Sequence, residues 1–298
     1  MKSKFKSIAF MTVFLLTVHW VTGQKPNSRF NGVQIGVITY SYRELPDQSL
    51  PAILDCVVKS GINSIELLGD AVERYAGVPK GDKDAIRQWR TTVSMDKFKA
   101  ARKMFKDRGI DIHMLNMGVG DLSWSDEELD YAFRACKAVG AKGIATEISE
   151  DAAKRLAPFA DKHKLYVIFH NHGQPGQPDF SFDRILQHGK RLMLNLDVGH
   201  YFGATGVHPN EVIQRLHDRI FSIHVKDKTS KTASAPNQIR PFGKGDTPLA
   251  DIFQLIKKEN WKIYCDIELE YKVPADSDPV KEVIKCVEYC KQILQQIK

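Results

Sequence analysis

Short apolar segments alternate with amphipathic segments from residue 33 to the end of the chain, and this alternation constrains the fold more than any other feature. Eight of the segments are mostly continuous hydrophobic runs, as expected for parallel strands that are covered on both faces. The predicted strands are Gln34–Thr39, Ser64–Leu68, Asp111–Asn116, Gly143–Thr146, Tyr166–His170, Leu192–Asp197, Ile220–Val225 and Ile263–Glu268.

Amphipathic helical segments follow these strands. Ser125, with Glu128 three residues later, has the spacing of a capping box, and Gly61 and Gly109 follow helical segments as C-cap glycines do. The predicted helices are Leu50–Ser60, Met95–Arg108, one that begins at Ser125, Ser149–His163, Ser181–Gly189, Pro209–Asp218, Thr247–Glu259 and Pro279–Ile297.

Eight strands and eight helices predict an α/β protein with a single-domain (β/α)8 TIM barrel, which we expect to span residues 24–298. The main alternative is a doubly wound open sheet. That fold places a glycine-rich phosphate turn after its first strand, whereas Gly36 is isolated in this sequence. Two longer loops, Gly69–Ser94 and Asp227–Asp246, are expected to project over the catalytic rim of the barrel.

The first residues have the pattern of a secretory signal peptide, residues 1–23. Lys2, Lys4 and Lys6 precede an apolar run over Ile8–Val18 that is too short to span a membrane comfortably, and small residues end at Gly23. We therefore expect an exported protein, periplasmic or secreted, without a membrane anchor after cleavage. An uncleaved anchor is the alternative reading.

The charge of the chain does not indicate a nucleic-acid-binding protein. Removal of the three N-terminal lysines with the signal peptide changes the formal net charge from +7 to +4. Nucleic-acid binding requires a clustered basic face, and the sequence shows no basic cluster with interleaved aromatic residues.

Four polar residues stand where apolar strands end: Glu147, Asp197, His224 and Glu268. The carboxyl ends of the strands of a parallel barrel share one rim, which carries the active site. Several carboxylates with one imidazole suit a divalent cation such as Mn, Mg, Co or Zn. The four residues are therefore predicted metal ligands.

Each of these residues also has a structural interpretation that the sequence leaves open. Asp197 could cap the next helix, and Glu147 could be the first-turn acid of a helix. His224 could be a hydrogen-bonded strand residue without a ligand role. The metal interpretation is favoured because four candidate ligands end four strands.

Further polar residues adjoin these positions and are expected to contact substrate. Because side chains alternate along a strand, His170 and His172 share one face, as do His224 and Lys226. Lys226 is expected at the mouth of the barrel, where a cation can hold a substrate oxygen. Glu270 is on the same face as Glu268; Glu268 is the preferred ligand, and the two assignments could be reversed.

The pattern resembles the xylose-isomerase-like TIM-barrel superfamily, the sugar phosphate isomerases/epimerases with inosose dehydratase and tagatose epimerase relatives. The resemblance covers about residues 33–296. It rests on Glu147, on His170-Asn-His172, on Asp197-x-x-His200, on His224-x-Lys-Asp and on the terminal Ile-Glu-Leu-Glu. The family often has Glu-Asn-His where this chain has His170-Asn-His172.

The resemblance implies that Glu147, Asp197, His224 and Glu268 hold a divalent metal and that His200 contacts substrate. It further implies an isomerase or epimerase that acts on a keto sugar through a metal-bound cis-enediolate, with Glu147 and Glu268 as base and acid. Since sugar phosphates are mainly cytosolic, the expected export favours an unphosphorylated sugar.

Two alternatives share parts of this interpretation. A 3-keto-glycoside lyase or dehydratase would form the same enediolate and then eliminate a leaving group. A non-catalytic exported sugar-binding protein would bind the ligand without exchanging a proton. A homo-oligomer is compatible with all three, and DNA repair is disfavoured by the predicted export and the modest charge.

Overall fold

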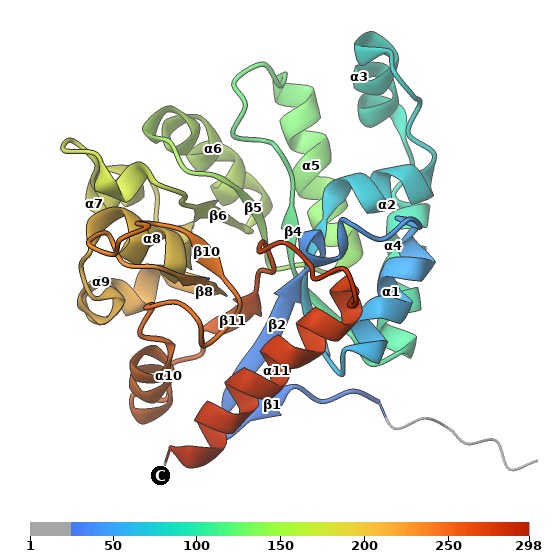
Figure 1. Cartoon of the computed structure of the whole chain (residues 1–298). Helices are drawn as coiled ribbons and strands as arrows, with labels where there is room; N and C mark the ends of the chain where they lie inside the picture. The colour runs from blue at the N-terminus through green and yellow to red at the C-terminus, as the bar shows by residue number, and fades with distance from the viewer. Residues whose placement is uncertain (1–24, 298) are drawn as a thin grey trace, which may run out of the picture.

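The computed structural model describes residues 25–297, and the predicted signal peptide lies outside them. Its main feature is a closed barrel of eight parallel strands, with helices around it (Figure 1). The barrel strands are β2 (Val33–Ile38), β3 (Ser64–Leu68), β4 (Asp111–Asn116), β5 (Gly143–Glu147), β6 (Tyr166–His170), β7 (Leu192–Asp197), β8 (Ile220–Val225) and β11 (Tyr264–Ile267). All eight predicted strands and the (β/α)8 fold class are confirmed.

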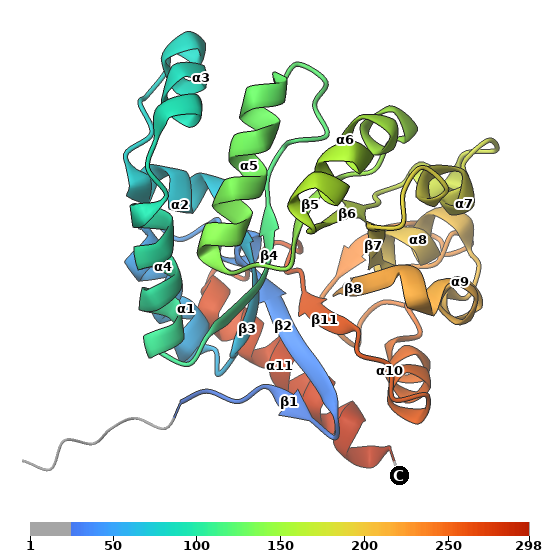
Figure 2. The same cartoon turned by 180° about the vertical axis from the view of Figure 1, so that it is seen from behind.

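The barrel closes between its first and last strands. β11 pairs in parallel with β8 on one side and with β2 on the other, and β2 also pairs with β3. The short β1 (Arg29–Phe30) adds an antiparallel edge to β2. Near the C-terminus, the Asn31 amide donates to the carbonyls of Leu294 and Ile297, at 2.8 and 2.9 Å. The turn between β1 and β2 therefore lies next to the C-terminal end of the described chain (Figure 2).

Helices cover the outside of the barrel, where they bury the outward faces of the strands. In the order of the chain they are α1 (Leu50–Lys59), α2 (Gly69–Ala76), α3 (Lys83–Thr92), α4 (Asp96–Asp107), α5 (Asp126–Val139), α6 (Glu150–His163), α7 (Phe182–Leu186), α8 (Val198–Thr205), α9 (Pro209–Leu216), α10 (Leu249–Lys258) and α11 (Pro279–Gln296). The predicted capping box is present, because the Ser125 side chain accepts from the Glu128 N–H and Glu128 accepts from the Ser125 N–H. Three 3₁₀ helices lie at Thr39–Tyr42, Gln174–Gly176 and His217–Arg219.

The prediction of a long loop over Gly69–Ser94 is wrong, because α2 and α3 occupy most of it. Helix α3 has no buried residue, so its sequence carries no continuous apolar stripe that would have indicated a helix. Asp82 is the N-cap of α3, and its side chain accepts from the Asp84 N–H. Arg90 of this helix donates a hydrogen bond to Glu73 of α2. α3 stands above the carboxyl ends of the strands in Figures 1 and 2.

The second predicted loop is present, with a short antiparallel pair of strands, β9 (Asp227–Lys228) and β10 (Ile239–Arg240), inside it. Asp227 anchors its far end, because its carboxylate accepts the N–H groups of Gly243, Gly245 and Thr247. The loop therefore returns to the rim next to the start of β9.

The interior of the barrel contains a small apolar cluster and a set of buried polar residues. Met114, Ala145, Ile168 and Phe221 form an apolar cluster of their own, separate from the core between strands and helices. Buried polar residues occupy the rest of the interior, among them Glu66, Asn195, His224 and Asp266. Within the described residues, no helix is long and apolar enough to cross a membrane.

Candidate active site

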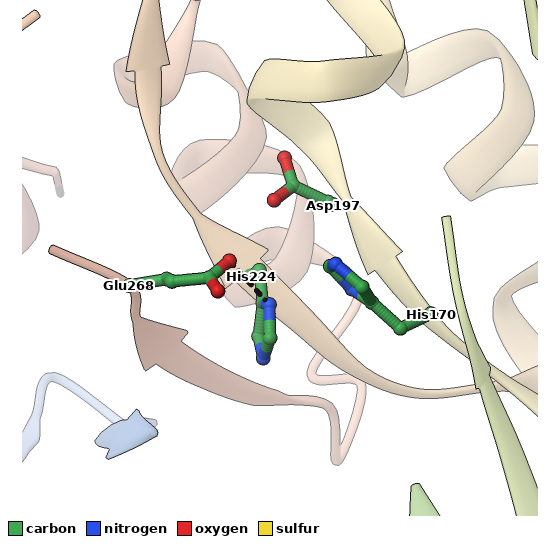
Figure 3. A group of neighbouring side chains, drawn as sticks. All are labelled: His170, Asp197, His224 and Glu268. Carbon is green, nitrogen blue, oxygen red and sulfur yellow. Dashed lines mark ion pairs between the residues drawn. The ribbon is translucent and has the colours of Figure 1, made fainter. Parts of the chain in front are cut away.

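Four buried side chains converge at the carboxyl ends of neighbouring strands (Figure 3). His170 ends β6, Asp197 ends β7, His224 lies in β8, and Glu268 follows β11 directly. Each offers one ligand atom, and these atoms lie within 4.8 Å of one another. None of the four residues is more than 5% exposed. Strand ends separated by about a hundred residues thus build one compact group.

One candidate ligand atom of each of these residues is buried: His170 Nδ1, Asp197 Oδ2, His224 Nδ1 and Glu268 Oε2. His224 Nδ1 lies 2.8 Å from Glu268 Oε2, and both carboxylate oxygens lie within 2.9 Å of Lys226 Nζ. His170 Nδ1 has no hydrogen-bond partner among the described residues. A buried polar atom without a partner destabilises a fold by about 1–3 kcal/mol, so native proteins contain few of them. Two imidazole nitrogens and two carboxylate oxygens are a ligand set that suits Zn, Mn or Co. The group fits a divalent cation, which would bind all four atoms together.

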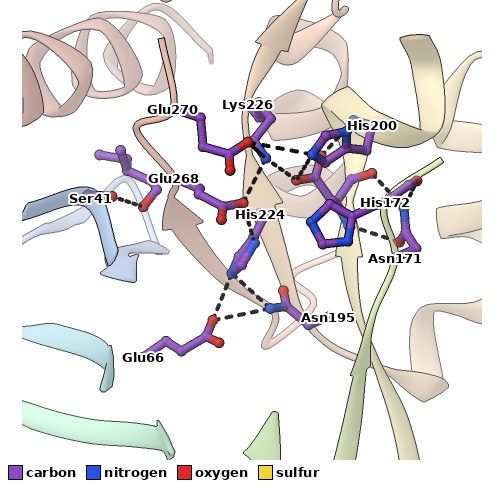
Figure 4. Close-up of polar contacts among 12 residues, drawn as sticks. Ser41, Glu66, Asn171, His172, Asn195, His200, His224, Lys226, Glu268 and Glu270 are labelled. Carbon is purple, nitrogen blue, oxygen red and sulfur yellow. Dashed lines mark hydrogen bonds and ion pairs between the residues drawn. The ribbon is translucent and has the colours of Figure 1, made fainter. Parts of the chain in front are cut away.

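Glu66 orients the imidazole of His224 (Figure 4). Nε2 of His224 lies 2.7 Å from Oε2 of the fully buried Glu66 and donates its proton there, while Nδ1 faces Glu268 Oε2 at 2.8 Å. Burial opposes protonation of the ring, but Glu268 and Glu66 hold the pKa of His224 well above its usual value. Asn116 and Asn195 donate to the two Glu66 oxygens, at 2.7 and 3.1 Å. A carboxylate behind the imidazole is the usual support of a metal-binding histidine.

Lys226 lies among the carboxylates, deeper than the position at the mouth that the sequence indicated. Its side chain is 1% exposed, and Nζ is 2.9 Å from Asp197 Oδ2, 2.8 Å from Glu268 Oε2 and 2.5 Å from Glu270 Oε2. Burial alone would lower the pKa of Lys226, but the three carboxylates hold it above its usual value. The ammonium therefore balances the negative charge of the site.

The segment after β11 is fixed so that two carboxylates reach this ammonium. The Leu269 N–H donates to Ser41 Oγ at 3.0 Å (Figure 4), and the Glu268 N–H donates to the Val225 carbonyl at 3.2 Å. Burial opposes ionisation of Glu268, but Lys226 and His224 hold its pKa well below the usual value. Glu268 and Glu270 thus share a face, as predicted.

Glu147 is the expected ligand that the structure does not bring into this group. Its side chain is 62% exposed at the rim, and Oε2 accepts from His172 Nδ1 at 3.0 Å. Glu147, His170 and His172 form a second, more open group of candidate ligands. Desolvation opposes ionisation of Glu147, but the hydrogen bond from His172 keeps its pKa below the usual value. His170 thus belongs to both groups and joins the buried one in place of Glu147.

Side chains alternate along β6 and the residues that follow it, so the two histidines and the asparagine of the His-Asn-His segment face opposite sides. His170 and His172 share a face, with ring centroids 4.6 Å apart. Asn171 points the other way, where its Oδ1 accepts from the Asp197 N–H at 3.1 Å and its Nδ2 donates to the Asp197 carbonyl at 3.3 Å. Asn171 therefore holds the end of β7 in register with β6.

His200 lies in the first turn of α8, directly above Asp197. Its N–H donates to Asp197 Oδ1 at 2.6 Å, so Asp197 caps the helix with one oxygen and keeps Oδ2 for the cluster. Lys228, which is buried, donates from Nζ to His200 Nδ1 at 3.1 Å. His200 Nε2 then faces Glu270 Oε2 at 3.6 Å. The helix-capping interpretation of Asp197 is therefore confirmed, and its second oxygen stays available for the predicted ligand role.

Sequence reasoning missed Glu66, Asn195 and Lys228. An available signal for Glu66 was its position in Ser-Ile-Glu-Leu-Leu, because an acid in the middle of a buried strand needs a partner. Lys228 lies two residues beyond Lys226, where the strand was expected to have become a loop.

Solved structures with the same fold include a sugar phosphate isomerase/epimerase, a probable dehydratase and an epimerase. A sugar phosphate isomerase/epimerase from Parabacteroides distasonis is 20% identical with a TM-score of 0.61, covering 87% of this chain and 95% of the other. A probable 3-DHS dehydratase involved in petrobactin synthesis, from Bacillus anthracis, is 18% identical with a TM-score of 0.62, covering 86% and 99%. An L-ribulose 3-epimerase is 12% identical with a TM-score of 0.60, covering 89% and 95%. At these identities the likeness establishes the fold.

Family membership follows from the sequence itself. No curated protein sequence matches the chain significantly. A family model described as xylose isomerase-like TIM barrel matches residues 54–290, which include all the polar residues of the site. The chain therefore belongs to the xylose isomerase-like TIM barrel family.

Proposed function

We propose that this protein is an exported, divalent-metal-dependent isomerase or epimerase of an unphosphorylated keto sugar. The observation that carries the proposal is the convergence of four buried candidate ligand atoms within 4.8 Å of one another, contributed by His170, Asp197, His224 and Glu268. Isomerases and epimerases among the proteins of similar fold support the same class of reaction.

The bound cation would polarise the substrate carbonyl and acidify the adjacent C–H bond. The four residues of the group would hold it, with Glu66 fixing the His224 ring. Lys226 would keep the carboxylates of Asp197, Glu268 and Glu270 in place through its ion pairs. The geometry of the group would thus be set before the substrate arrives, which limits reorganisation during the reaction.

Proton transfer is assigned to the accessible groups around the cluster. Glu147 is exposed, and its lowered pKa keeps it a carboxylate at neutral pH, so it can remove the proton next to the carbonyl. Glu268, the acid expected from the sequence, is engaged by Lys226 and His224, so we assign it to the cation. His200 and Glu270 then provide the second proton-transfer position.

The charges of the site favour a neutral sugar over a sugar phosphate. Three carboxylates form ion pairs with the Lys226 ammonium, and the Lys228 ammonium donates a hydrogen bond to His200. A phosphate dianion would meet Glu147 and Glu270 at the same rim without a free cation among these site residues. An unphosphorylated substrate also agrees with the signal peptide predicted at residues 1–23.

Elimination is the second candidate reaction, because a probable dehydratase has the same fold. In a 3-keto-glycoside lyase, Glu147 would remove the same proton, and the electron pair would expel the aglycone oxygen from the neighbouring carbon. The leaving oxygen would take its proton from the His200–Glu270 pair. Atoms and charges balance without a redox partner.

The test begins with metal analysis of the purified protein. The metal-loaded protein is then incubated in D2O with unphosphorylated keto sugars and with 3-keto-glycosides. Deuterium at the carbon next to the carbonyl, with an isomer or epimer as product, supports the leading proposal. Release of aglycone with a 2-hydroxy-glycal product supports elimination. Binding without deuterium exchange would identify a sugar-binding protein and overturn both proposals.

A further inference from the structure

A cavity lies at the carboxyl ends of β3 and β4, on the rim of the barrel. It has a volume of about 350 Å³, and its lining includes Leu68, Arg90, Asn116, Met117, Gly118 and Trp124. α3 supplies Arg90, and the segment between β4 and α5 supplies Gly118 and Trp124. The cavity thus lies on the same end of the barrel as the metal-ligand group, across the β3 and β4 side of the mouth.

Two hydrogen bonds connect this cavity to the cluster. Asn116, which lines the cavity, donates from Nδ2 to Glu66 Oε1 at 2.7 Å. The other Glu66 oxygen lies 2.7 Å from His224 Nε2. A single buried carboxylate therefore separates the cavity wall from a candidate metal ligand. Cavity and cluster are thus neighbours at the carboxyl ends of the strands.

The charged residues of the cavity are already paired. The Arg90 guanidinium lies 4.0 Å from the centroid of the Trp124 ring and makes ion pairs with Glu73 at 3.0 Å and Glu128 at 3.2 Å. Glu73 also accepts from the Tyr131 hydroxyl at 3.0 Å. This network fixes the indole on one face and leaves no unpaired charge on Arg90 for an ionic ligand.

The remaining surface suits a neutral ring. The Trp124 indole is flat, Leu68 and Met117 are apolar, and Gly118 leaves space beside them. Aromatic side chains bind the apolar faces of rings and lose little conformational entropy when they do so. The volume is at the lower end of the roughly 300–1,000 Å³ of small-molecule sites, which is enough for one ring and too small for a longer chain.

We infer that this cavity binds the second ring of a two-ring keto-glycoside whose ketose ring lies at His170, Asp197, His224 and Glu268. The inference rests on the proposed function and narrows its substrate class from free keto sugars to glycosides. Trp124 stacks on the second ring, and the cavity determines preference among substrates without taking part in proton transfer.

Gly118→Leu tests the inference by filling the cavity. A Cβ at Gly118 would meet no atom within 4 Å, and Gly118 is not in the left-handed region, so the larger side chain fits without strain. The measurement is kcat/KM for a 3-keto-disaccharide divided by kcat/KM for the methyl 3-keto-glucoside. We expect this ratio to fall at least tenfold in Gly118→Leu and about fivefold to tenfold in Trp124→Ala.

Leu122→Ala is the matched control, because Leu122 is an exposed apolar residue of the same segment that does not line the cavity. Its ratio should equal that of the unmodified protein. An unchanged ratio in both Gly118→Leu and Trp124→Ala would overturn the inference, as would a wild-type ratio at or below one.

A binding experiment separates this inference from the proposed function. If the wild type turns over no keto sugar, calorimetric titration can still be done with the unoxidised disaccharide and the methyl glucoside. It compares the binding affinity for a two-ring ligand with that for a one-ring ligand. Tighter binding of the disaccharide that Gly118→Leu abolishes supports the cavity as a ring site. Equal affinities in the wild type would overturn it.

Discussion

Two buried histidines inside the same barrel have different surroundings. His113 in β4 uses both ring nitrogens, with Ser64 Oγ at 2.9 Å from Nδ1 and Asp266 Oδ2 at 2.9 Å from Nε2, and it stacks on Tyr264 with centroids 4.1 Å apart. His224 in β8 has Nε2 at 2.7 Å from Glu66 Oε2 and Nδ1 at 2.8 Å from an oxygen of Glu268, which belongs to the group of candidate ligands. Both rings are at most 1% exposed, so burial does not separate them.

The two histidines differ in the residues that surround each imidazole ring. His113 completes a closed group; Asp266 keeps Oδ1 without a partner, but neither residue belongs to a candidate ligand group among the described residues. Around His224, candidate ligand atoms of His170, Asp197 and Glu268 lie within 4.8 Å of one another and of the atom that His224 offers. A histidine of the first kind stabilises the barrel, and one of the second kind is arranged to bind a ligand.

The largest effect is expected from His224→Ala. Loss of one of four ligands should reduce bound metal from about one per chain to near zero and lower kcat/KM by about a thousandfold or more. Asp197→Ala should behave alike. Metal content is measured by elemental analysis of protein purified without chelator. Full metal content in both variants would refute the assignment of the site.

His113→Leu should give the converse result. It leaves the buried Asp266 carboxylate without its imidazole, which should lower the free energy of unfolding by about 3 kcal/mol. The metal dissociation constant should stay within about twofold of the wild-type value. Urea unfolding and metal titration of the same preparation check both statements, and a large loss of metal affinity with normal stability would break the comparison.

Glu66→Gln removes the charge behind the His224 ring while keeping the size of the side chain. We expect metal affinity to fall about 10–100-fold, as for other residues that orient a metal-binding histidine. Asn195→Ala removes a weaker neighbour of the same ring and should have a smaller effect. If metal affinity is unaffected in Glu66→Gln, Glu66 has only a structural role.

The metal-free protein should become less stable in acid because of His170. Burial, with the nearby His224 charge, lowers the pKa of His170 to about 4, so between about pH 6.5 and pH 4 the unfolded state binds the proton and the folded state does not. Stability attributable to His170 is therefore lost as pH falls through that window, by about 2 kcal/mol at pH 5. His170→Asn should be less acid-sensitive, as measured by urea midpoints at pH 7 and pH 5. Equal pH dependence in both proteins would contradict this.

The smallest effect is expected from Lys228→Met, which removes the donor to His200 Nδ1. His200 can then rotate or change tautomer, and kcat should fall about fivefold to tenfold with metal content unchanged. Lys231→Met, an exposed lysine of the same loop, is the control. A fall in metal content in Lys228→Met would show that Lys228 supports the cluster and not His200.

Much of this architecture was predictable because the barrel strands are buried on both faces. Such strands read as continuous apolar runs, and polar residues at their ends, such as Asp197 and Glu268, mark the rim. The direction of a side chain at the rim was harder to predict. β5 exposes Glu147, which shares the inward face of Ala145 but lies beyond it at the open rim, so the expected ligand reaches His172 and not the buried group.

The rest depended on contacts that local patterns do not encode. Glu66 lies next to a shift of register between β3 and β4, and its partner His224 is distant in sequence. α3 is fixed by Arg90 through Glu73 and Glu128, not by an apolar face, so hydrophobic periodicity could not reveal it. Long-range ion pairs were therefore outside the reach of the sequence interpretation.

The position of β11 between β2 and β8 has a consequence for the newly synthesised chain. The last strand to leave the ribosome is the one that joins the two open edges of the other seven. Until it arrives, those edges stay unpaired, and Glu268 is missing from its group. A nascent or truncated chain lacking this strand thus has neither a closed barrel nor the complete group of four candidate ligand residues.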